Sequence, residues 1–294
     1  MVEYNTIILG SGISGMSCAI YLKRAGIRTL IIENNVPGGQ LNRIGTIENY
    51  PGYLSVQGPD LALELFGQVN EYQVDYEYGE VISIDYEKKI VQVENKKFWY
   101  HHLVIATGRR EKRLGLEHEE ELIGCGISFC ATCDGALFRN QDVIVVGGGN
   151  SAVSEAIYLA QICRKVVLIY RNQVLRSEEI LKSRLAKISN IQVLYNSTIQ
   201  SYITLDGKVS GVCLEDGTKI DASCVFLAIG HIPNSELFDG EKENGYIIVD
   251  SHYRTSQPFV YACGDVIKKE LYQLITASSE GVLVASDIIK NNIE

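Results

Sequence analysis

The sequence lacks any apolar run near the roughly 20 residues that a membrane-spanning helix needs. Its apolar stretches, such as residues 6–9 and 143–146, have the length of strands. It also lacks an excess of positive charge, since its formal net charge is -9, whereas nucleic acid demands clustered Lys and Arg. Residues 1–5 carry neither the basic nor the apolar region of a secretory signal. We therefore expect no membrane span, no binding of nucleic acid and a cytoplasmic location.

Proline is also scarce, with 5 residues in 294, and charged residues make up 21% of the chain. Together with a hydrophobic content of 46%, this composition is typical of a globular chain that is folded throughout. The length is about twice that of a typical domain of about 150 residues. The chain is thus expected to form two domains, each with its own core.

Only one pair among the 8 cysteines, Cys130 and Cys133, is separated by two residues. A thiol pair with this spacing closes a small disulfide ring, and neighbouring groups can lower the pKa of one sulfur so that it exchanges at neutral pH. The pair therefore predicts a redox-active dithiol and a role in electron transfer. Zinc binding is the alternative, but it needs two further ligands, and only Cys125 lies nearby. Most other cysteines are expected to be small buried hydrophobic residues.

A glycine-rich fingerprint, Gly10-Ser11-Gly12-Ile-Ser-Gly15, lies between an apolar strand at residues 5–9 and a helix predicted at 16–25. A second strand at 28–32 leads to Glu33, which lies 18 positions after Gly15. An acidic residue about 20 positions after the glycines binds the ribose in dinucleotide folds. The segment therefore predicts a βαβ unit that binds a dinucleotide.

The same pattern recurs later in the chain, with a strand at 142–146, a helix at 154–163 and a strand at 166–170. Its fingerprint is Gly147-Gly-Gly149-Asn150-Ser151-Ala152. Each copy offers backbone N–H groups and a helix N-terminus to a pyrophosphate. Two copies fit two nucleotides, or a flavin and a nicotinamide.

Alternating segments at 72–95 and 191–224 follow the two units and are predicted to form antiparallel meanders. His101 and His102 are interpreted as a polar start to the strand that follows the first meander. Because both halves share one plan, we predict an α/β fold with two Rossmann-like (three-layer) nucleotide-binding domains, the second inserted into the first. Residues 1–110 and 244–294 are expected to form the first domain and 111–243 the second, with seams near 110–113 and 239–244.

Several further motifs accompany the fingerprints: Gly38-Gly-Gln40-Leu, Glu48-Asn-Tyr-Pro-Gly52, Ala106-Thr-Gly108, Cys130-Ala-Thr-Cys133-Asp134-Gly135, Ala228-Ile-Gly-His-Ile-Pro-Asn234 and Ala262-Cys-Gly264-Asp265-Val266. Over essentially its full length the chain resembles the low-molecular-weight bacterial thioredoxin reductases. The resemblance implies FAD in the discontinuous domain, a redox disulfide in the inserted domain, a homodimer, and thioredoxin or a thioredoxin-like protein as acceptor.

By the same resemblance, electrons pass from reduced FAD to the Cys130–Cys133 disulfide and then to the partner. Cys133 is implied to face the flavin, Cys130 to attack the partner, and Asp134 to act as general acid. The inserted domain is implied to rotate between two orientations, with hinges at the seams. The residues implied for FAD are Gly10, Ser11, Gly12, Gly15, Glu33, Gly39, Gln40, Asn49, Thr107, Gly108, Gly264, Asp265 and Gln273. Those implied for a pyridine nucleotide are Gly147, Gly149, Asn150, Ser151, Ala152, Arg171 and Arg176.

The chain departs from the family where cations bind the 2′-phosphate of NADPH, since Tyr170-Arg171-Asn172 replaces His-Arg-Arg and is followed by Arg176. Ser154 stands where the family has a glutamate near the nicotinamide, and Leu271-Tyr272-Gln273 replaces Tyr-Arg-Gln. The electron donor therefore stays open: NADPH is favoured, and the alternatives are NADH and reduced ferredoxin, as in the related clostridial-type flavin thioredoxin reductases.

Two other readings of the same motifs stay open. The depleted phosphate site suits a flavin and disulfide redox sensor without turnover, although the complete thiol motif with Asp134 opposes that role. Ferredoxin–NADP reductases of similar architecture are a further alternative, but they lack the paired thiols. A role for Cys125 as an auxiliary thiol is also left open.

Overall fold

The computed structural model describes residues 2–44 and 46–291. The chain forms two compact units, of which the first consists of Met1–Arg110 and Ile232–Glu294 and the second of Glu111–His231. The chain passes between them twice, within two short strands that pair with each other, β9 (Arg109–Glu111) and β18 (His231–Pro233).

The main sheet of the first unit is seven-stranded, in the order β5-β2-β1-β8-β7-β6, with β21 paired to β8. Their bounds are β1 (Val2–Leu9), β2 (Thr29–Glu33), β5 (Asp75–Tyr78), β6 (Val81–Asp85), β7 (Ile90–Val93), β8 (Lys96–Ile105) and β21 (Val260–Ala262). Strands β5, β2, β1, β8 and β21 run parallel, whereas β7 pairs antiparallel both with β6 and with the start of β8. The long strand β8 therefore joins a parallel nucleotide-binding sheet to a meander.

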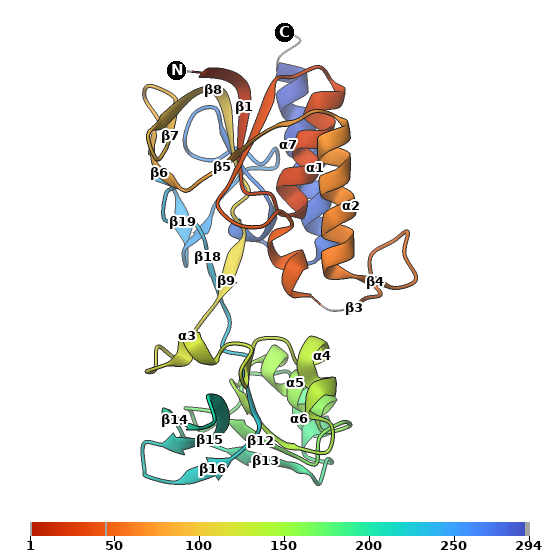
Figure 1. Ribbon diagram of the computed structural model, residues 1–294, viewed down its shortest axis with the longest axis vertical. Coiled ribbons are helices and arrows are strands. Elements are labelled where there is room, and N and C mark those ends of the chain that lie inside the picture. The colour runs from red at the N-terminus through yellow and green to blue at the C-terminus, as the bar shows by residue number, and fades with distance from the viewer. Residues whose placement is uncertain (1, 45, 292–294) are drawn as a thin grey trace. The chain divides into compact units, whose positions relative to one another are not determined.

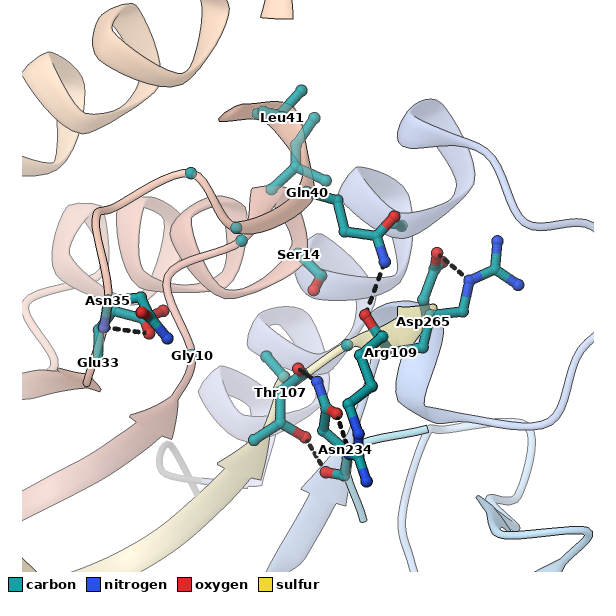
Figure 2. A pocket seen from close by; sticks show the side chains of 18 of the residues that line it. Gly10, Ser14, Glu33, Asn35, Gln40, Leu41, Thr107, Arg109, Asn234 and Asp265 are labelled. Atoms are coloured by element: carbon teal, nitrogen blue, oxygen red, sulfur yellow. Dashed lines mark hydrogen bonds and ion pairs between the residues drawn. The ribbon is translucent and has the colours of Figure 1, made fainter. Parts of the chain in front are cut away.

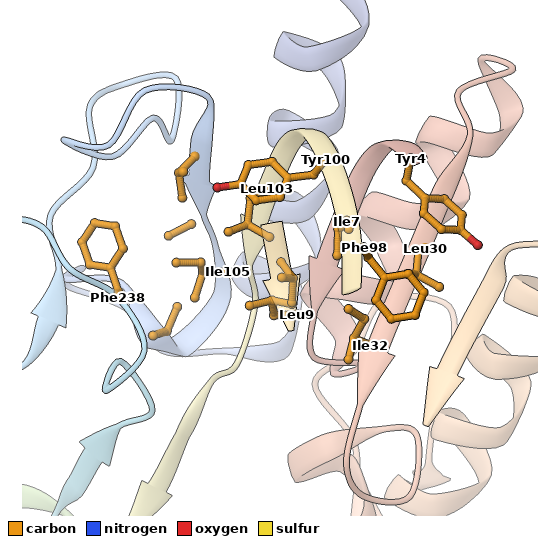
Figure 3. Close-up of a cluster of buried hydrophobic side chains, with 14 of the residues drawn as sticks. Tyr4, Ile7, Leu9, Leu30, Ile32, Phe98, Tyr100, Leu103, Ile105 and Phe238 are labelled. Carbon is orange, nitrogen blue, oxygen red and sulfur yellow. The ribbon is translucent and has the colours of Figure 1, made fainter. Parts of the chain in front are cut away.

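Helices α1 (Ile13–Arg24), α2 (Gly58–Glu71) and α7 (Leu274–Asn291) lie side by side on one face of this sheet (Figure 1). Successive strand residues point to opposite faces. Ile8 packs among the residues of α1 and α7, whereas Ile7 and Leu9 belong to the core on the other face, with Phe98 and Phe238 (Figure 3). Both faces of the central strands are therefore buried, as expected for a parallel sheet.

The start of α1 is held against α7 by close backbone packing. A Cβ on Gly281 of α7 would overlap the carbonyl oxygen of Ser14, and one on Gly264 would overlap the Ser14 hydroxyl. Gly281 therefore cannot take a larger side chain without moving α1, and Gly264, with a φ of +79°, adopts a conformation that favours glycine. These contacts set the position of the turn that precedes α1, where the first fingerprint lies.

The second unit has its own parallel sheet, in the order β10-β17-β11-β12-β13. Its strands are β10 (Ile127–Ser128), β11 (Asp142–Val146), β12 (Lys165–Ile169), β13 (Ile191–Leu194) and β17 (Cys224–Leu227), and its helices are α3 (Glu119–Leu122), α4 (Ala131–Asp134), α5 (Asn150–Leu159) and α6 (Glu179–Leu185). A separate antiparallel sheet contains β14 (Ile199–Leu205), β15 (Lys208–Leu214) and β16 (Lys219–Asp221). The unit thus repeats the plan of the first one.

Short elements complete the described chain. They are the 3-10 helices η1 (Gly39–Arg43), η2 (Gly135–Phe138) and η3 (Gly264–Val266), and the strand pairs β3 (Thr46–Ile47) with β4 (Val56–Gln57) and β19 (Lys242–Glu243) with β20 (Tyr246–Ile247).

The chain returns to the first unit at Ile232, whereas the sequence placed the return at residue 244. Asn234 and Phe238 account for the difference. The Asn234 side chain donates to the carbonyl of Thr107 at 2.9 Å, and Phe238 is 2% exposed within the core of the first unit. Residues 232–243 therefore pack with the first unit, and the seam predicted at 239–244 lies inside it.

The prediction of a meander over residues 72–95 was wrong for its first part. Strand β5 lies beside β2 and runs parallel to it, with Asp75 opposite Leu30, so the meander contains only β6, β7 and the start of β8. The second unit shows the same departure, because β13 is a parallel strand next to β12. Alternation of apolar and polar residues indicates a half-buried strand but does not show which strand lies next to it. The sequence therefore could not predict that β5 and β13 run parallel to their neighbours.

His101 and His102 were predicted to begin a strand, but both lie inside β8. His102 is 3% exposed, and burial lowers its pKa to about 4. Helices α1 and α5 also begin earlier than predicted, directly after the glycine turns. Fingerprint residues therefore form the first turn of each helix.

Candidate functional site

The first unit contains a cavity of about 950 Å³, within the size range of cofactor pockets. It lies at the C-terminal end of β1 and β2, where ligands bind in open α/β sheets. Ten residues implied for FAD line it (Figure 2): Gly10, Gly12, Glu33, Gly39, Gln40, Asn49, Thr107, Gly108, Asp265 and Gln273. Ser11, Gly15 and Gly264 are not among its lining residues.

The three fingerprint glycines have different surroundings. Gly10 has a φ of +101°, and a Cβ there would lie 2.5 Å from the carbonyl oxygen of Ala106. A Cβ on Gly15 would overlap the carbonyl oxygen of Gly10. For Gly12, by contrast, no described atom lies within 4 Å of the Cβ position. Two glycines therefore allow close backbone packing, and the third leaves space at the cavity wall.

Glu33 ends β2 beside the first fingerprint. Its Oε2 accepts hydrogen bonds from the backbone N–H of Ser11 at 2.8 Å and from the Ser11 hydroxyl at 3.0 Å. Its Oε1 accepts from the backbone N–H groups of Asn34 at 2.9 Å and Asn35 at 3.0 Å. A carboxylate has about four acceptor positions. A ribose hydroxyl that bonds to Glu33 therefore has to displace one of these donors, and the Ser11 hydroxyl is the one that can rotate away.

Polar side chains from distant segments meet at the other end of the cavity (Figure 2). Gln40 Nε2 donates to the carbonyl of Arg109 at 2.7 Å, and the Thr107 hydroxyl donates to the carbonyl of Asn234 at 2.6 Å. Asn49 Nδ2 donates to Gln273 Oε1 at 3.2 Å. The structure thus places Gln40, Asn49, Thr107 and Gln273 at one site, and it adds Asn234, which the sequence analysis did not assign to the site.

Asp265 belongs to a network of ion pairs that the sequence did not predict. Its carboxylate lies 3.1 Å from Arg109 Nε and 3.2 Å from Lys269 Nζ. Lys269 also lies 2.9 Å from Glu280 Oε2, which accepts a hydrogen bond from the backbone N–H of Gly264 at 2.8 Å. Burial raises the pKa of Glu280 although Lys269 opposes this shift. Lys269 lies four positions after Asp265, but Arg109 and Glu280 come from separate segments, so no local pattern could have revealed the whole network.

The glycine turn of the second unit has the same design. Gly147 has a φ of +143°, and a Cβ there would overlap the carbonyl oxygen of Ala228, while no described atom lies within 4 Å of the Cβ position of Gly149. The Asn150 side chain makes two hydrogen bonds to Glu178. Asn150 Nδ2 donates to Glu178 Oε1 at 2.9 Å, and Asn150 Oδ1 accepts from the backbone N–H of Glu178 at 2.8 Å. Ser151 and Ala152 lie in the first turn of α5, directly after this turn.

Tyr170 follows β12 at the place that Glu33 takes in the first unit, since each lies 23 positions after the first glycine of its fingerprint. Its ring lies against Gly148, where a Cβ would overlap it. Its hydroxyl accepts from Asn172 Nδ2 at 3.1 Å and from Arg176 Nε at 3.0 Å, and these bonds lower the pKa of Tyr170. Arg176 thus has a neutral phenol as a partner, and both Arg171 and Arg176 are exposed.

Cys130 and Cys133 form a disulfide whose Cα atoms are 5.3 Å apart. Cys130 caps the short helix α4, and its Sγ accepts from the backbone N–H of Cys133 at 3.1 Å. The Thr132 hydroxyl lies 3.4 Å from the same sulfur. The Asp134 carboxylate accepts from the Ser128 hydroxyl at 2.7 Å. Two donors thus converge on Cys130 Sγ, and an acid lies directly after the pair.

The other cysteines take no part in disulfides. Cys18, Cys163, Cys224 and Cys263 are buried, Cys213 is partly buried and Cys125 is exposed. Within residues 2–44 and 46–291, no group of three or more His, Cys, Asp and Glu is arranged to hold a metal ion. No helix among these residues combines the length and hydropathy of a membrane span.

Glu155 is a titratable group of α5 that lies directly after Ser154 and is not among the predicted site residues. Its Oε2 is buried without a hydrogen-bond partner in the described part of the chain, and burial raises its pKa to about 7. The folded protein thus holds a proton that the unfolded chain releases near the ordinary value of 4.5. The free energy of unfolding is therefore expected to fall as the pH rises from about 4.5 to 7.

Replacing this carboxyl by an amide should remove the pH dependence. We expect Glu155→Gln to match the wild type at pH 4 and to be more stable by about 3 kcal/mol at pH 8, because it has no charge to bury. Urea unfolding of the full-length protein and of the variant, followed by circular dichroism at both pH values, measures the difference in the free energy of unfolding. Glu179→Gln, at an exposed position of α6, is the matched control and should leave the profile unchanged. Equal pH slopes for Glu155→Gln and the wild type would contradict the prediction.

A chain with two nucleotide-binding units of one plan and a disulfide between neighbouring cysteines is, as a class, a dinucleotide-dependent disulfide oxidoreductase. The family model for pyridine nucleotide-disulphide oxidoreductases matches residues 4–281. The thioredoxin reductase of Listeria monocytogenes is 38% identical over 98% of this chain and 93% of its own length, and that of Bacillus subtilis is 35% identical over 97% and 93%. The chain belongs to this oxidoreductase family and, within it, to the low-molecular-weight bacterial thioredoxin reductases.

Solved structures agree with this assignment. The thioredoxin reductase of Lactococcus lactis in its FR conformation is 36% identical and has a TM-score of 0.80. The match covers 99% of this chain and 99% of that chain. The thioredoxin reductase of T. acidophilum is 31% identical with a TM-score of 0.78 over the whole of both chains. The predictions of the family, of an oxidoreductase and of an α/β fold with two Rossmann-like units are confirmed.

Proposed function

We propose that the chain binds FAD in the cavity of the first unit and reduces the disulfide of thioredoxin or a thioredoxin-like protein through Cys130 and Cys133. The observation that carries the proposal is the Cys130–Cys133 disulfide, with two donors on Cys130 Sγ and Asp134 directly after it. When bound, FAD supplies the electron pair that opens this disulfide.

The fit of FAD to the first unit rests on three features. The cavity of about 950 Å³ has the size of a cofactor pocket. The backbone at Gly12 leaves open space at its wall, and α1 begins there, so backbone N–H groups and the helix dipole can hold a pyrophosphate. Glu33 would hold the adenosine ribose in place of the Ser11 hydroxyl, and Gln40, Asn49 and Asp265 would line the flavin end.

The thiol chemistry follows from the surroundings of the two sulfurs. After reduction, the Cys133 N–H and the Thr132 hydroxyl stabilise a thiolate on Cys130, so Cys130 attacks one sulfur of the partner and expels the other as a thiolate. Cys133 then attacks Cys130 Sγ in this mixed disulfide, which re-forms the internal disulfide and releases the second partner thiolate. Asp134 gives a proton to a departing thiolate and recovers it from solvent.

For the source of electrons, we propose NADPH, bound at the second glycine turn. The open position at Gly149 fits a pyrophosphate, and Arg171 and Arg176 provide cations for a 2′-phosphate. The position of Tyr170, without a carboxylate, gives no support to NADH, whose free ribose is usually held by an acid. Reduced ferredoxin is the alternative donor, motivated by the loss of two of the family's cationic residues at Tyr170 and Asn172.

Anaerobic mixing of the oxidised flavoprotein with each donor tests this choice. NADPH should bleach the flavin rapidly and NADH slowly, and Arg171→Ala should raise the apparent Kd for NADPH by about ten- to a hundred-fold, the value of one charge-assisted bond. The same variant should leave bleaching by NADH unchanged, which is the internal control. Rapid bleaching by reduced ferredoxin, with none by NADPH, would replace NADPH as the donor.

Two further expectations belong to the proposed function. We propose a cytoplasmic homodimer, and we propose that β9 and β18 act as hinges that let the disulfide reach first the flavin and then the partner. One arrangement can hardly expose the same two sulfurs to both. Both crossings of the chain lie in these two strands, so a rotation there needs few backbone changes.

A further inference from the structure

Ser128 is the side chain that connects the sheet of the second unit to the redox-active segment. It ends β10, lies opposite Phe226 of β17 in the parallel sheet and is 5% exposed. Its backbone is therefore held by strand pairing, whereas Cys130 and Asp134 lie in a short helical segment after the strand. A fixed hydroxyl thus lies beside a segment that must change its bonding during turnover.

The hydroxyl of Ser128 makes two directional bonds. It donates to Asp134 Oδ2 at 2.7 Å, and it accepts from the backbone N–H of Cys130 at 3.1 Å. The backbone N–H of Asp134 in turn donates to the carbonyl of Cys130 at 3.1 Å. The hydroxyl also lies 3.4 Å from that carbonyl, a longer distance than the one to the carboxylate. The acid and the first cysteine are therefore tied to one serine.

These bonds decide how the carboxyl of Asp134 is presented. Within the described residues, the Ser128 hydroxyl is the hydrogen-bond partner of the Asp134 side chain, and this bond restrains the rotamer of the carboxyl group. With Oδ2 engaged, Oδ1 is the oxygen that can carry a proton. A proton donor must lie within hydrogen-bond reach of the group that it protonates, and a freely rotating carboxyl satisfies this only part of the time.

We propose that Ser128 is a positioning residue for disulfide reduction, which holds Asp134 so that Oδ1 can exchange a proton with the thiol pair. This inference rests on the proposed function and adds a residue to it. The step itself is balanced by the thiols and the acid: opening the disulfide with two electrons gives two thiolates, Asp134 protonates one of them, and solvent restores the proton on Asp134. Ser128 loses and gains nothing, since it only orients the acid.

A double-mutant cycle tests the proposal on the full-length flavoprotein. Ser128→Ala should lower the rate of thioredoxin reduction by about 10- to 100-fold, part of the 10²- to 10⁴-fold that general acid catalysis contributes. Asp134→Asn should lower it at least as much. If the serine acts through the acid, adding Ser128→Ala to Asp134→Asn should change the rate less than about two-fold, because groups that act as a unit are not additive.

Three controls separate positioning from folding. Reduction of a small dye by the flavin should be the same in all variants, because it does not pass through the thiols. Ser210→Ala removes a hydroxyl that bonds the backbone carbonyl of Ile203 in the antiparallel sheet of the same unit, and it should leave thioredoxin reduction unchanged. Ser128→Thr keeps the hydroxyl and should recover at least part of the rate.

The outcomes of these experiments distinguish a failure of this inference from a failure of the proposed function on which it rests. Wild-type rates for Ser128→Ala, or a full additional loss in the Asp134→Asn background, would overturn the positioning role and leave the proposed function standing. A wild-type flavoprotein that reduces no disulfide with any donor would overturn the proposed function itself.

Discussion

Cys133→Ser should abolish reduction of thioredoxin, with a rate loss of roughly three orders of magnitude or more, as is found when a nucleophile of a catalytic unit is removed. Cys130 alone still attacks the partner and forms a mixed disulfide. No second sulfur is then present at the 5.3 Å Cα separation of the native pair to resolve it. Steady-state reduction of thioredoxin measures the loss, and gel electrophoresis without reductant should show the trapped covalent complex.

The same variant should keep its flavin and still reduce a small dye at the wild-type rate. Cys125→Ser is the matched control, because Cys125 is an exposed free thiol five positions before Cys130. It should leave thioredoxin reduction unchanged, whereas a loss would identify Cys125 as an auxiliary thiol. Unchanged turnover in Cys133→Ser would contradict the assignment of the redox pair.

Gly12→Val should remove FAD from a protein that is otherwise folded. Gly12 has a φ of -69° and no described atom within 4 Å of its Cβ position, so the chain itself has room for the side chain. The valine instead takes space at the cavity wall that a pyrophosphate needs. Overpacking a fitted site costs about 1–3 kcal/mol, and the upper value lowers the affinity for FAD by about 100-fold. Absorbance of the purified variant and titration of the apoprotein with FAD measure this loss.

Two further glycine substitutions make that result specific. Gly15→Ala should lose both flavin and thermal stability, because its Cβ would overlap the carbonyl oxygen of Gly10 whether or not a ligand is bound. Gly67→Ala, at an open position inside α2, should keep the flavin and be slightly more stable, by up to about 1 kcal/mol. Full flavin content in Gly12→Val would count against FAD in this cavity.

The fingerprints could be recognised in the sequence because the backbone conformation of each turn itself requires glycine. Gly10 and Gly147 have positive φ values that favour glycine, and each follows a strand whose last residues are apolar and precedes a helix. The pair of cysteines is equally local, since two intervening residues suffice to close the ring. The site residues near Gly39 and Asp265, in contrast, were reached only through the family resemblance, because a polar loop has no periodic pattern.

Pairings between distant segments could not be predicted in this way. Strand β5 alternates like a meander strand, yet it runs parallel to β2 because its neighbour is chosen by packing across the sheet. Residues 234–238 carry no boundary signal, and their place in the first unit depends on the Thr107 carbonyl and on space for Phe238 in its core. Histidine is a polar residue type, yet His102 is buried in the middle of β8.

The sequence by itself determined that this chain has two nucleotide-binding units of one design and a reactive pair of cysteines, because turns, helix starts and a short disulfide ring depend on residues close together in the chain. Only the tertiary structure decided what each of these features contacts. The folded sheets and helices bring the Tyr170 ring against the backbone of Gly148, place Lys269 between Asp265 and Glu280, and bring the Ser128 hydroxyl to Asp134. Such contacts are fixed by packing and by the need to pair buried polar groups, and neither can be read from residue order alone.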